Sequence, residues 1–465
     1  MTASQRLIDE FAKAGGKRPF KALGASGQIG YGIPTPSFQA GLARKPDMIG
    51  CDGGSIDHGP YYLGSGNMAT ALGATKRDYR KMLLGARKLG VPLVIGSAGS
   101  AGAAPHLDRV LGLVRDIARE EKLNFTLGTL RADISKDVVK RAIANRTIEG
   151  FEGMDPLTPQ AVDAAANIVG QMGMSSFRRA FEAGVDVLIT GRACDTAIFA
   201  ALPTMLGFPT GLSIHMAKII ECASICCLPG GRDPILATLD QDGFELESMS
   251  PTRRATPTSV AAHSLYEQSD PYTIYEPAGH ANLQDARYEA VNDRVTRVSG
   301  ARWEPAQFQT VKLEGATRVG QRAAVLCASA DPRFIANHED ILPKVAETVR
   351  ELTCEDSPQD YSLTWRVYGV NGVHGGAVDV TGVREIFMLI ECVAPTDERA
   401  GEVARTMKQY LMHFGYPGRL STGGNLAFPF NPPEASLGEV HRFNVYHLMR
   451  SDDIESLFPL EIERL

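Results

Sequence analysis

The first 250 residues alternate between short apolar runs that end in glycine-rich polar loops and stretches with helical periodicity. This alternation constrains the fold more than any other feature. The apolar runs cover residues 20–24, 48–50, 92–96, 124–128 and 185–189, and the helical stretches cover 76–89, 108–121, 135–144 and 175–183. Strands that alternate with helices form mostly parallel sheets with right-handed crossovers. We therefore predict an α/β domain over residues 1–250, with a mostly parallel, doubly wound sheet.

The second half of the chain has a different pattern of apolar and polar residues. Residues 295–299, 309–313 and 362–369 mix apolar and polar positions in near alternation, as half-buried strands do. Two helical stretches, 341–352 and 398–414, accompany them. This pattern predicts an α+β domain over residues 251–465, with a hinge at 251–257, that closes the crevice of the first domain.

Charge and hydropathy exclude some classes of partner. The net charge is −6 and there is no basic block, so we expect no binding to nucleic acid. No apolar stretch is long enough to span a membrane, and the N-terminal residues lack the apolar core of a signal peptide. We therefore expect a cytoplasmic protein that does not enter the membrane.

The eight cysteines do not have the spacing of a metal site. Cys222, Cys226 and Cys227 form the only cluster, and no Cys-x2-Cys pair exists. The spacing argues against an iron–sulfur cluster and favours buried free thiols.

The loop over residues 51–66 has the highest density of side chains that can take part in catalysis or bind a metal. Asp52, Asp57 and His58 stand among five glycines directly after an apolar run. Such side chains can transfer protons, and the two carboxylates could also hold a divalent metal such as Mg or Mn. The alternative is structural, with Asp52 capping a turn and His58 on the surface.

Two other glycine-rich loops follow strands. One contains Gly27 and Gln28, and the other contains Ser97, Gly99 and Ser100. Neither is a dinucleotide fingerprint, since the order Gly-x-Gly-x2-Gly is absent. Backbone N–H groups in such loops can bind a carboxylate or a phosphate, although ordinary turns have the same composition.

Further candidates follow along the chain. Arg192 and Asp195 come after a buried strand, where the arginine could clamp a substrate carboxylate or pair with Asp195. His215 and Glu221 share one broad face of a helix predicted over 212–227 and could move protons or simply pack.

The second half adds three more candidates, each of which could equally be structural. His263 lies on a helix that follows Thr256-Pro257. Asn371 and His374 lie in a glycine-rich loop and are expected to close the crevice from the second domain.

Several of these segments together resemble the acyclic terpene utilisation (AtuA) family. They are Gly191-Arg192-x-x-Asp195, the helix from His215 to Glu221-Cys222 before Gly230-Gly231, the run from Thr256 to His263, and Glu276-Pro277-x-Gly279. The cysteine-rich segment 222–231 and the acidic loop depart from the family pattern, which suggests a divergent branch. The resemblance implies a role in degrading acyclic terpenes through branched acyl-CoA intermediates, beside a small partner subunit.

These observations predict an enzyme, a hydro-lyase that adds or removes water next to the carboxyl group of a small branched acid or its CoA thioester. Arg192 and the loop at Gly99 would hold the anion, and Asp57, His58, His215 or Glu221 would move the proton. Isomerisation or C–C cleavage would use the same groups. The alternative is a non-catalytic subunit that binds a small acid or serves as a scaffold. We expect a homo-oligomer in either case.

Overall fold

The computed structural model describes residues 1–15, 18–151, 153–355, 358–376, 379–420 and 425–465. Its helices are α1 (Ala3–Ala14), α2 (Thr35–Ala43), α3 (Pro60–Ser65), α4 (Leu72–Leu89), α5 (Ala104–Glu120), α6 (Lys136–Ala144), α7 (Pro159–Ala164), α8 (Met174–Ala183), α9 (Asp195–Met205), α10 (Thr210–Ile220), α11 (Pro257–Ser264), α12 (Pro332–Thr353) and α13 (Asp397–His413).

The strands in the first 300 residues are β1 (Phe20–Gly24), β2 (Met48–Asp52), β3 (Leu93–Gly96), β4 (Thr126–Leu130), β5 (Ile148–Gly150), β6 (Asn167–Gly170), β7 (Val187–Thr190), β8 (Ile235–Leu239), β9 (Gly243–Ser248), β10 (Thr273–Glu276), β11 (Gly279–Asn282), β12 (Arg287–Ala290) and β13 (Val295–Ser299). The later strands are β14 (Arg302–Pro305), β15 (Thr310–Ser329), β16 (Ser362–Tyr368), β17 (Ile386–Ala394), β18 (Glu434–Arg450) and β19 (Leu460–Arg464).

The main sheet has ten strands in the order β12-β13-β9-β8-β1-β2-β3-β7-β4-β19. The mixed α/β class is confirmed, but the sheet is parallel only in its middle, from β1 to β4. The outer strands pair antiparallel, because short turns rather than crossover helices connect β8 to β9 and β12 to β13.

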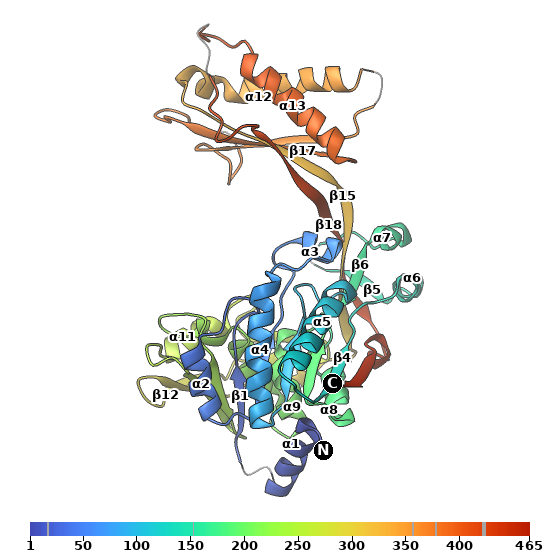
Figure 1. Cartoon of the computed structure of the whole chain (residues 1–465), viewed down its shortest axis with the longest axis vertical. Helices are drawn as coiled ribbons and strands as arrows, with labels where there is room; N and C mark the ends of the chain where they lie inside the picture. The colour runs from blue at the N-terminus through green and yellow to red at the C-terminus, as the bar shows by residue number, and fades with distance from the viewer. Residues whose placement is uncertain (16–17, 152, 356–357, 377–378, 421–424) are drawn as a thin grey trace. The chain divides into compact units, whose positions relative to one another are not determined.

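Both faces of the parallel strands are buried under helices. On one face Ile49, Ile95 and Ile189 pack with residues of α2, α4 and α5. On the other face Met48 and Leu188 pack with residues of α8, α9 and α10. Figure 1 shows α4 and α5 side by side over the sheet. This double cover explains why the central strands read as continuous apolar runs.

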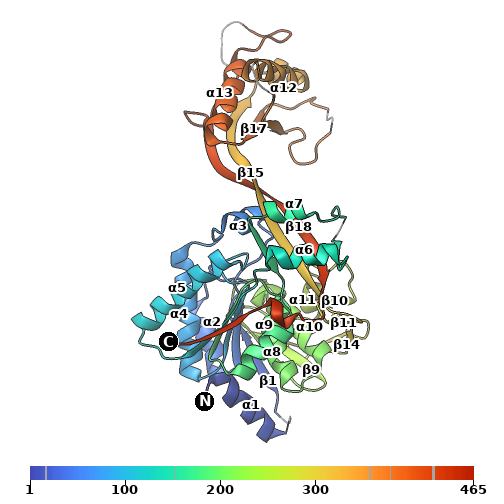
Figure 2. The same cartoon turned by 90° about the vertical axis from the view of Figure 1, so that its right-hand side faces the viewer.

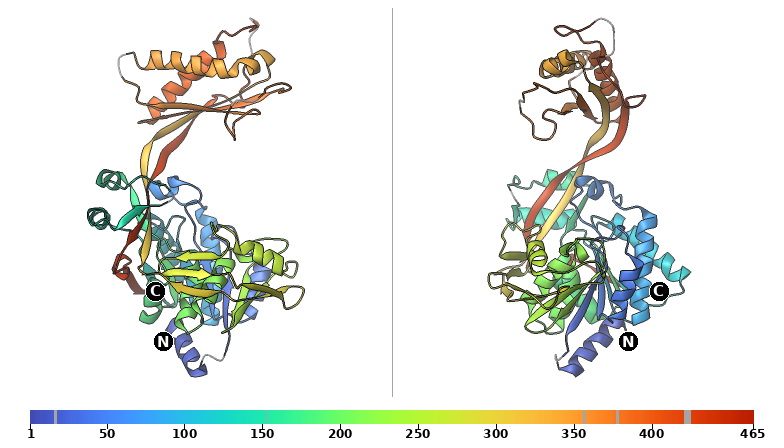
Figure 3. Two further views of the ribbon diagram at one scale, coloured as in Figure 1. Left: turned by 180° about the vertical axis from the view of Figure 1, so that it is seen from behind. Right: turned by 90° about the vertical axis from the view of Figure 1, so that its left-hand side faces the viewer.

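The chain divides into two compact units, and the division differs from the predicted boundary at 250/251. The first unit comprises residues 1–317 and 443–465, and the second comprises 318–442. The predicted hinge at 251–257 lies inside the first unit. The physical reason is that the β12–β13 hairpin continues the main sheet by pairing with β9. The small sheet β10-β11-β14 also lies in the first unit, and it is visible from behind in Figure 3.

The second unit has the expected α+β character. In it β17 pairs with β15 and β16, and α12 and α13 cover one face of these strands. The chain passes between the units along β15 and β18, which Figure 2 shows in yellow and red. Within the first unit, residues Leu313–Ala316 of β15 pair with β6. In the part of the chain that the structure describes, no helix has the length and apolar character needed to cross a bilayer.

Candidate active site

A cavity of about 210 Å³ lies at the carboxyl ends of the parallel strands β1, β2 and β7. We call it the carboxyl cavity. The loop after β1, the end of β2 with its loop, the start of α9, the segment after α10 and the segment after α11 all contribute to it. Its lining residues are Gly27, Gln28, Tyr31, Asp52, Ser55, Asp57, His58, Asp195, Glu221, Cys222, Ile225, Tyr266 and Glu267. Ligands of open α/β sheets bind at this edge.

Three carboxyl groups and one amide in the cavity are buried without a full set of partners. Asp52 Oδ1, Asp195 Oδ1, Glu221 Oε2 and Gln28 Nε2 have no hydrogen-bond partner among the residues that the structure describes. Asp52 and Glu221 are only 8% and 3% exposed. Buried polar atoms are normally paired, and a group of unpaired ones in a single cavity marks a place for a ligand.

The pKa of each of these three carboxyl groups is raised. Burial is the largest cause for all three, and it raises the pKa of Asp52, Asp195 and Glu221. The negative charge of Asp195 adds to this effect at Asp52 and at Glu221. Carboxyl groups with a raised pKa can carry a proton near neutral pH and can therefore act as acids or bases.

Lys218 distinguishes Glu221 from the other two acids. Its Nζ lies 2.5 Å from Glu221 Oε1 and 3.3 Å from Glu267 Oε2. Burial acts to lower the pKa of Lys218, but the neighbouring carboxylates Glu221, Asp195 and Glu267 outweigh it and raise that pKa. The lysine therefore stays charged and favours the ionised form of Glu221. Asp52 forms no ion pair with a basic side chain among the described residues.

The backbone at Glu221 differs from the predicted helix over 212–227. Helix α10 ends at Ile220, and Ala223 adopts a left-handed φ of 51°. The chain therefore leaves the helix where it meets the cavity. Glu267, on the other side of the cavity, is also left-handed at φ 59°. Non-glycine residues in this conformation are uncommon and concentrate at functional sites.

The loop after β3 does not line the cavity but supports it from behind. A Cβ on Gly54 would lie 2.4 Å from Ser100 Cα, so the loop after β2 rests directly on this backbone. Ser100 Oγ accepts a hydrogen bond from the Ala69 N–H at 2.7 Å, and Ser97 Oγ accepts one from Arg192. Gly99 packs against His106. The predicted anion site at Ser97, Gly99 and Ser100 stays a prediction, and in this structure both serine hydroxyl groups accept hydrogen bonds from other parts of the protein.

Arg192 is buried and already holds a carboxylate. Its Nε donates to Glu314 Oε2 at 2.8 Å, and its Nη2 donates to Glu314 Oε1 at 3.3 Å. Lys312 Nζ lies 3.2 Å from the same Oε1. Neither predicted role describes this residue, since the guanidinium clamps Glu314 rather than a substrate or Asp195. Asp195 instead presents its free oxygen to the cavity.

Asp57 and His58 lie at the mouth of the cavity, where both are exposed. The His58 ring packs edge-on against Tyr62, with the ring centroids 5.8 Å apart. The cavity thus contains buried acids at its wall and an exposed Asp–His pair at its entrance.

His215 and His263 do not line the cavity. His215 is fully buried, its Nε2 lies 3.0 Å from Ser264 Oγ, and burial lowers its pKa to about 3. The predicted catalytic role of His215 stays a prediction, and in this structure its ring is enclosed by packing outside the cavity. His263 stacks on Tyr266 with ring centroids 5.4 Å apart, and burial lowers its pKa to about 4.

Asn371 and His374 belong to the second unit. There they line a separate hollow of about 400 Å³ with Trp365 and Glu339. Their role in closing the crevice of the first unit stays a prediction.

The residues that the structure describes contain no group of three or more His, Cys, Asp or Glu side chains arranged to hold a metal ion. Asp52 and Asp57 share the cavity, and a divalent metal between them stays a prediction. The cysteines are free thiols, with Cys226 Sγ and Cys227 Sγ 4.0 Å apart.

The structure adds residues that sequence reasoning missed. Tyr31, Ser55 and Ile225 line the cavity. Asp78 holds the loop after β1 by accepting hydrogen bonds from the backbone N–H groups of Gly30 and Gly32, at 2.9 and 3.0 Å. The contact joins residues almost fifty positions apart, so no local pattern could have revealed it.

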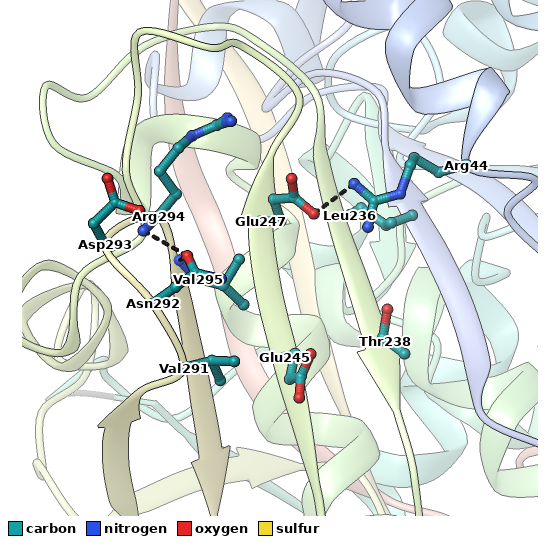
Figure 4. Close-up of a pocket in the computed structure, with 10 residues that line it drawn as sticks. All are labelled: Arg44, Leu236, Thr238, Glu245, Glu247, Val291, Asn292, Asp293, Arg294 and Val295. Carbon is teal, nitrogen blue, oxygen red and sulfur yellow. Dashed lines mark hydrogen bonds and ion pairs between the residues drawn. The ribbon is translucent and has the colours of Figure 1, made fainter.

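A second hollow in the first unit provides a contrast. This edge hollow, of about 450 Å³, lies over the antiparallel strands β8 and β9 and the β12–β13 turn. Figure 4 shows the ion pair between Arg44 and Glu247 at its rim, where Nη1 and Oε2 are 2.6 Å apart. Its lining residues are Arg44, Leu236, Thr238, Glu245, Glu247, Val291, Asn292, Asp293, Arg294 and Val295.

Comparison with known proteins gives one match. Residues 80–227 and 249–429, more than half of the chain, match the model of the family described as acyclic terpene utilisation family protein AtuA. No curated protein and no solved structure matches the chain. The matched ranges include Asp195, Glu221 and Glu267, whereas Gln28 and Asp52 lie before them. The chain belongs to the acyclic terpene utilisation (AtuA) family.

Proposed function

We propose that this protein is an enzyme of acyclic terpene breakdown, a hydro-lyase that adds or removes water next to the carbonyl group of a small branched acyl substrate. The observation that carries the proposal is the convergence of three acids, each with a buried and unpaired carboxyl oxygen, in one cavity at the carboxyl edge of the sheet. They are Asp52, Asp195 and Glu221. The family supplies the metabolic context of terpene utilisation.

The different surroundings of Glu221 and Asp52 suggest which of them acts as the base and which as the acid. Glu221 lies 2.5 Å from Lys218 Nζ, whose charge favours the ionised form, and it acts as the base that removes a proton from the carbon next to the carbonyl group. Asp52 forms no ion pair with a basic side chain among the described residues, and burial raises its pKa, which favours the protonated form. It donates its proton to the hydroxyl group on the next carbon. That group leaves as water, and a carbon–carbon double bond forms. The reverse sequence adds water.

Gln28 supplies a third function. Its Nε2 is a buried donor without a partner and lines the same cavity. A donor in this position can hydrogen-bond to the carbonyl oxygen and stabilise the negative charge that develops there when the neighbouring carbon loses its proton.

The charges of the site favour a thioester over a free acid. Arg192 and Lys218, the buried cations nearby, are both engaged by carboxylates. A free carboxylate would enter a cavity already lined by acids, whereas a thioester carbonyl is neutral. Tyr31, Ile225 and Tyr266 are 53%, 52% and 48% exposed and offer apolar surface beside the acids. We therefore propose a branched acyl-CoA as the substrate.

The test is a panel of branched 2-enoyl-CoA thioesters, with water addition followed by the loss of enoyl-thioester absorbance. Asp52→Asn and Glu221→Gln should lower turnover by about 10²–10⁴-fold, the usual contribution of a positioned acid or base. Glu247→Gln, in the edge hollow, is the matched control and should keep full activity.

Full turnover in both site variants would refute the proposed roles. A wild-type protein that binds the thioesters in calorimetry without converting any of them would instead support a non-catalytic acyl-binding subunit and overturn the enzyme.

A further inference from the structure

A third hollow in the first unit, of about 260 Å³, has a mainly apolar lining surface. We call it the Trp303 pocket. It lies between the start of α8 and the turn from β10 to β11. Its lining residues are Gly173, Met174, Ser175, Arg178, Thr204, Thr210, Glu276, Pro277, Ala278, Trp303, Gln309 and Ile454.

Two charged groups stand out against this apolar wall. Glu276 accepts a hydrogen bond from the Thr196 hydroxyl through one oxygen, while its other oxygen, Oε2, is buried without a partner among the described residues. Arg178 is exposed at the rim and forms no ion pair with any residue that the structure describes. An unpaired cation and an unpaired carboxyl oxygen beside an apolar surface can recognise an amphiphilic ligand.

The pocket is separate from the carboxyl cavity, because the two share no lining residue. They meet only across the start of α9. Asp195 lines the cavity, and its neighbour Thr196 contacts Glu276. Burial raises the pKa of Glu276 to about 7, and the charge of Asp195 adds to this while Thr196, Lys218 and Cys194 act to lower it. Near neutral pH the Glu276 carboxyl group is therefore often protonated and can donate a hydrogen bond.

We infer that the Trp303 pocket binds a small apolar monocarboxylate. The apolar body lies against Trp303, Met174 and Pro277. The carboxylate is held between the Arg178 guanidinium, by charge-assisted hydrogen bonds, and the protonated Glu276 carboxyl group. This site goes beyond the proposed function and does not depend on it.

The chain offers a direct reporter for the test. It has two tryptophans, Trp303 and Trp365, and Trp365 lies in the second unit. In a Trp365→Phe background, the fluorescence of Trp303 should change saturably when hexanoate is added. Hexan-1-ol should bind more weakly and hexylamine not at all.

Variants then identify the contacts. Arg178→Gln should weaken hexanoate binding about tenfold or more, the scale of a lost charged hydrogen bond. Arg141→Gln, an exposed arginine on α6 that lines neither pocket, should leave binding unchanged. Glu221→Gln should also leave it unchanged, which separates this result from the fate of the proposed enzyme.

The role of Glu276 is tested through pH. Hexanoate affinity should fall as the pH rises through about 7, because ionised Glu276 repels the ligand. Glu276→Gln should bind with little pH dependence. The inference is overturned if hexanoate gives no saturable change, if Arg178→Gln binds as well as its parent, or if hexylamine binds as tightly as hexanoate.

Discussion

The carboxyl cavity and the edge hollow belong to the same unit and are both rich in charge, yet they differ in how their charges are paired. The edge hollow is the larger, at about 450 Å³ against 210 Å³. Its Glu247 pairs with Arg44, and the Nη2 of Arg294 donates to the Ser248 and Ser250 carbonyl oxygens. None of its lining residues has a buried polar atom without a partner among the described residues, whereas the carboxyl cavity has four. Buried polar atoms without hydrogen-bond partners, rather than a large volume, mark the carboxyl cavity as the candidate functional site.

The largest expected effect is at Arg192, which lies beneath the carboxyl cavity. Arg192→Met leaves the fully buried Glu314 without its bidentate partner and should lower the free energy of unfolding by about 3–5 kcal/mol. Urea unfolding followed by circular dichroism measures the loss. A loss below 1 kcal/mol would show that the buried pair is no stronger than the surface pair at Arg44.

The next effect concerns His215, which is buried but lines neither the carboxyl cavity nor the edge hollow. Its pKa of about 3 in the folded protein lies below the ordinary value of 6.5, so the folded state resists protonation. Its contribution to stability is present above pH 6.5 and is lost as the pH falls. Between pH 7.5 and pH 5 this contribution to the free energy of unfolding should fall by about 2 kcal/mol.

His215→Gln, which does not titrate, removes this contribution. The difference in unfolding free energy between wild type and variant should therefore shrink by that amount at pH 5. A difference that stays constant with pH would mean that the ring takes up a proton in the folded protein as readily as in the unfolded chain.

Asp52→Asn tests the carboxyl cavity itself. Here the contribution to stability changes with pH in the direction opposite to that of His215. The folded pKa of Asp52 is raised, so its favourable contribution exists below the ordinary pKa near 4 and is lost as the pH rises. The variant should be more stable than wild type at pH 8 by about 1–2 kcal/mol, and the advantage should vanish near pH 4. Thermal melts at the two pH values measure it. A destabilised variant at pH 8 would show that the Asp52 carboxylate has a stabilising partner.

The smallest effect is expected in the edge hollow. Arg44 and Glu247 are 46% and 22% exposed at their side chains, and water screens such pairs. Glu247→Gln should change the free energy of unfolding by about 0–1 kcal/mol at any pH between 5 and 8. A larger loss by urea unfolding would remove the contrast between the two hollows.

The sequence predicted the elements whose signals are local. Apolar runs followed by polar, glycine-rich loops located the loops after β1, β2 and β7. Seven predicted site residues line one cavity: Gly27, Gln28, Asp52, Asp57, His58, Asp195 and Glu221. These predictions needed only that parallel strands end at a common edge.

The errors have a common physical origin in long-range pairing. Arg192 was expected to clamp a substrate carboxylate or to pair with Asp195, because it follows a buried strand. Its actual partner, Glu314, lies 122 residues away on β15, where no local pattern could reveal it. The antiparallel strands at the sheet edge, and therefore the extent of the first unit, depend on pairings such as β9 with β13 that alternation alone does not encode. His215 has the residue type of a catalyst, and only the fold shows that its side chain is fully buried and does not line the cavity.

The interrupted first unit has a consequence for synthesis on the ribosome. Its main sheet is completed by β19, which pairs with β4 across more than 300 residues of chain. The second unit is continuous, from 318 to 442, and emerges before that strand. Domains generally fold as units during synthesis. The second unit can therefore fold while the edge of the main sheet at β4 is still unpaired. During synthesis β4 is thus an edge strand without its partner β19. Such an edge is prone to aggregation until residues 460–464 emerge and cover it.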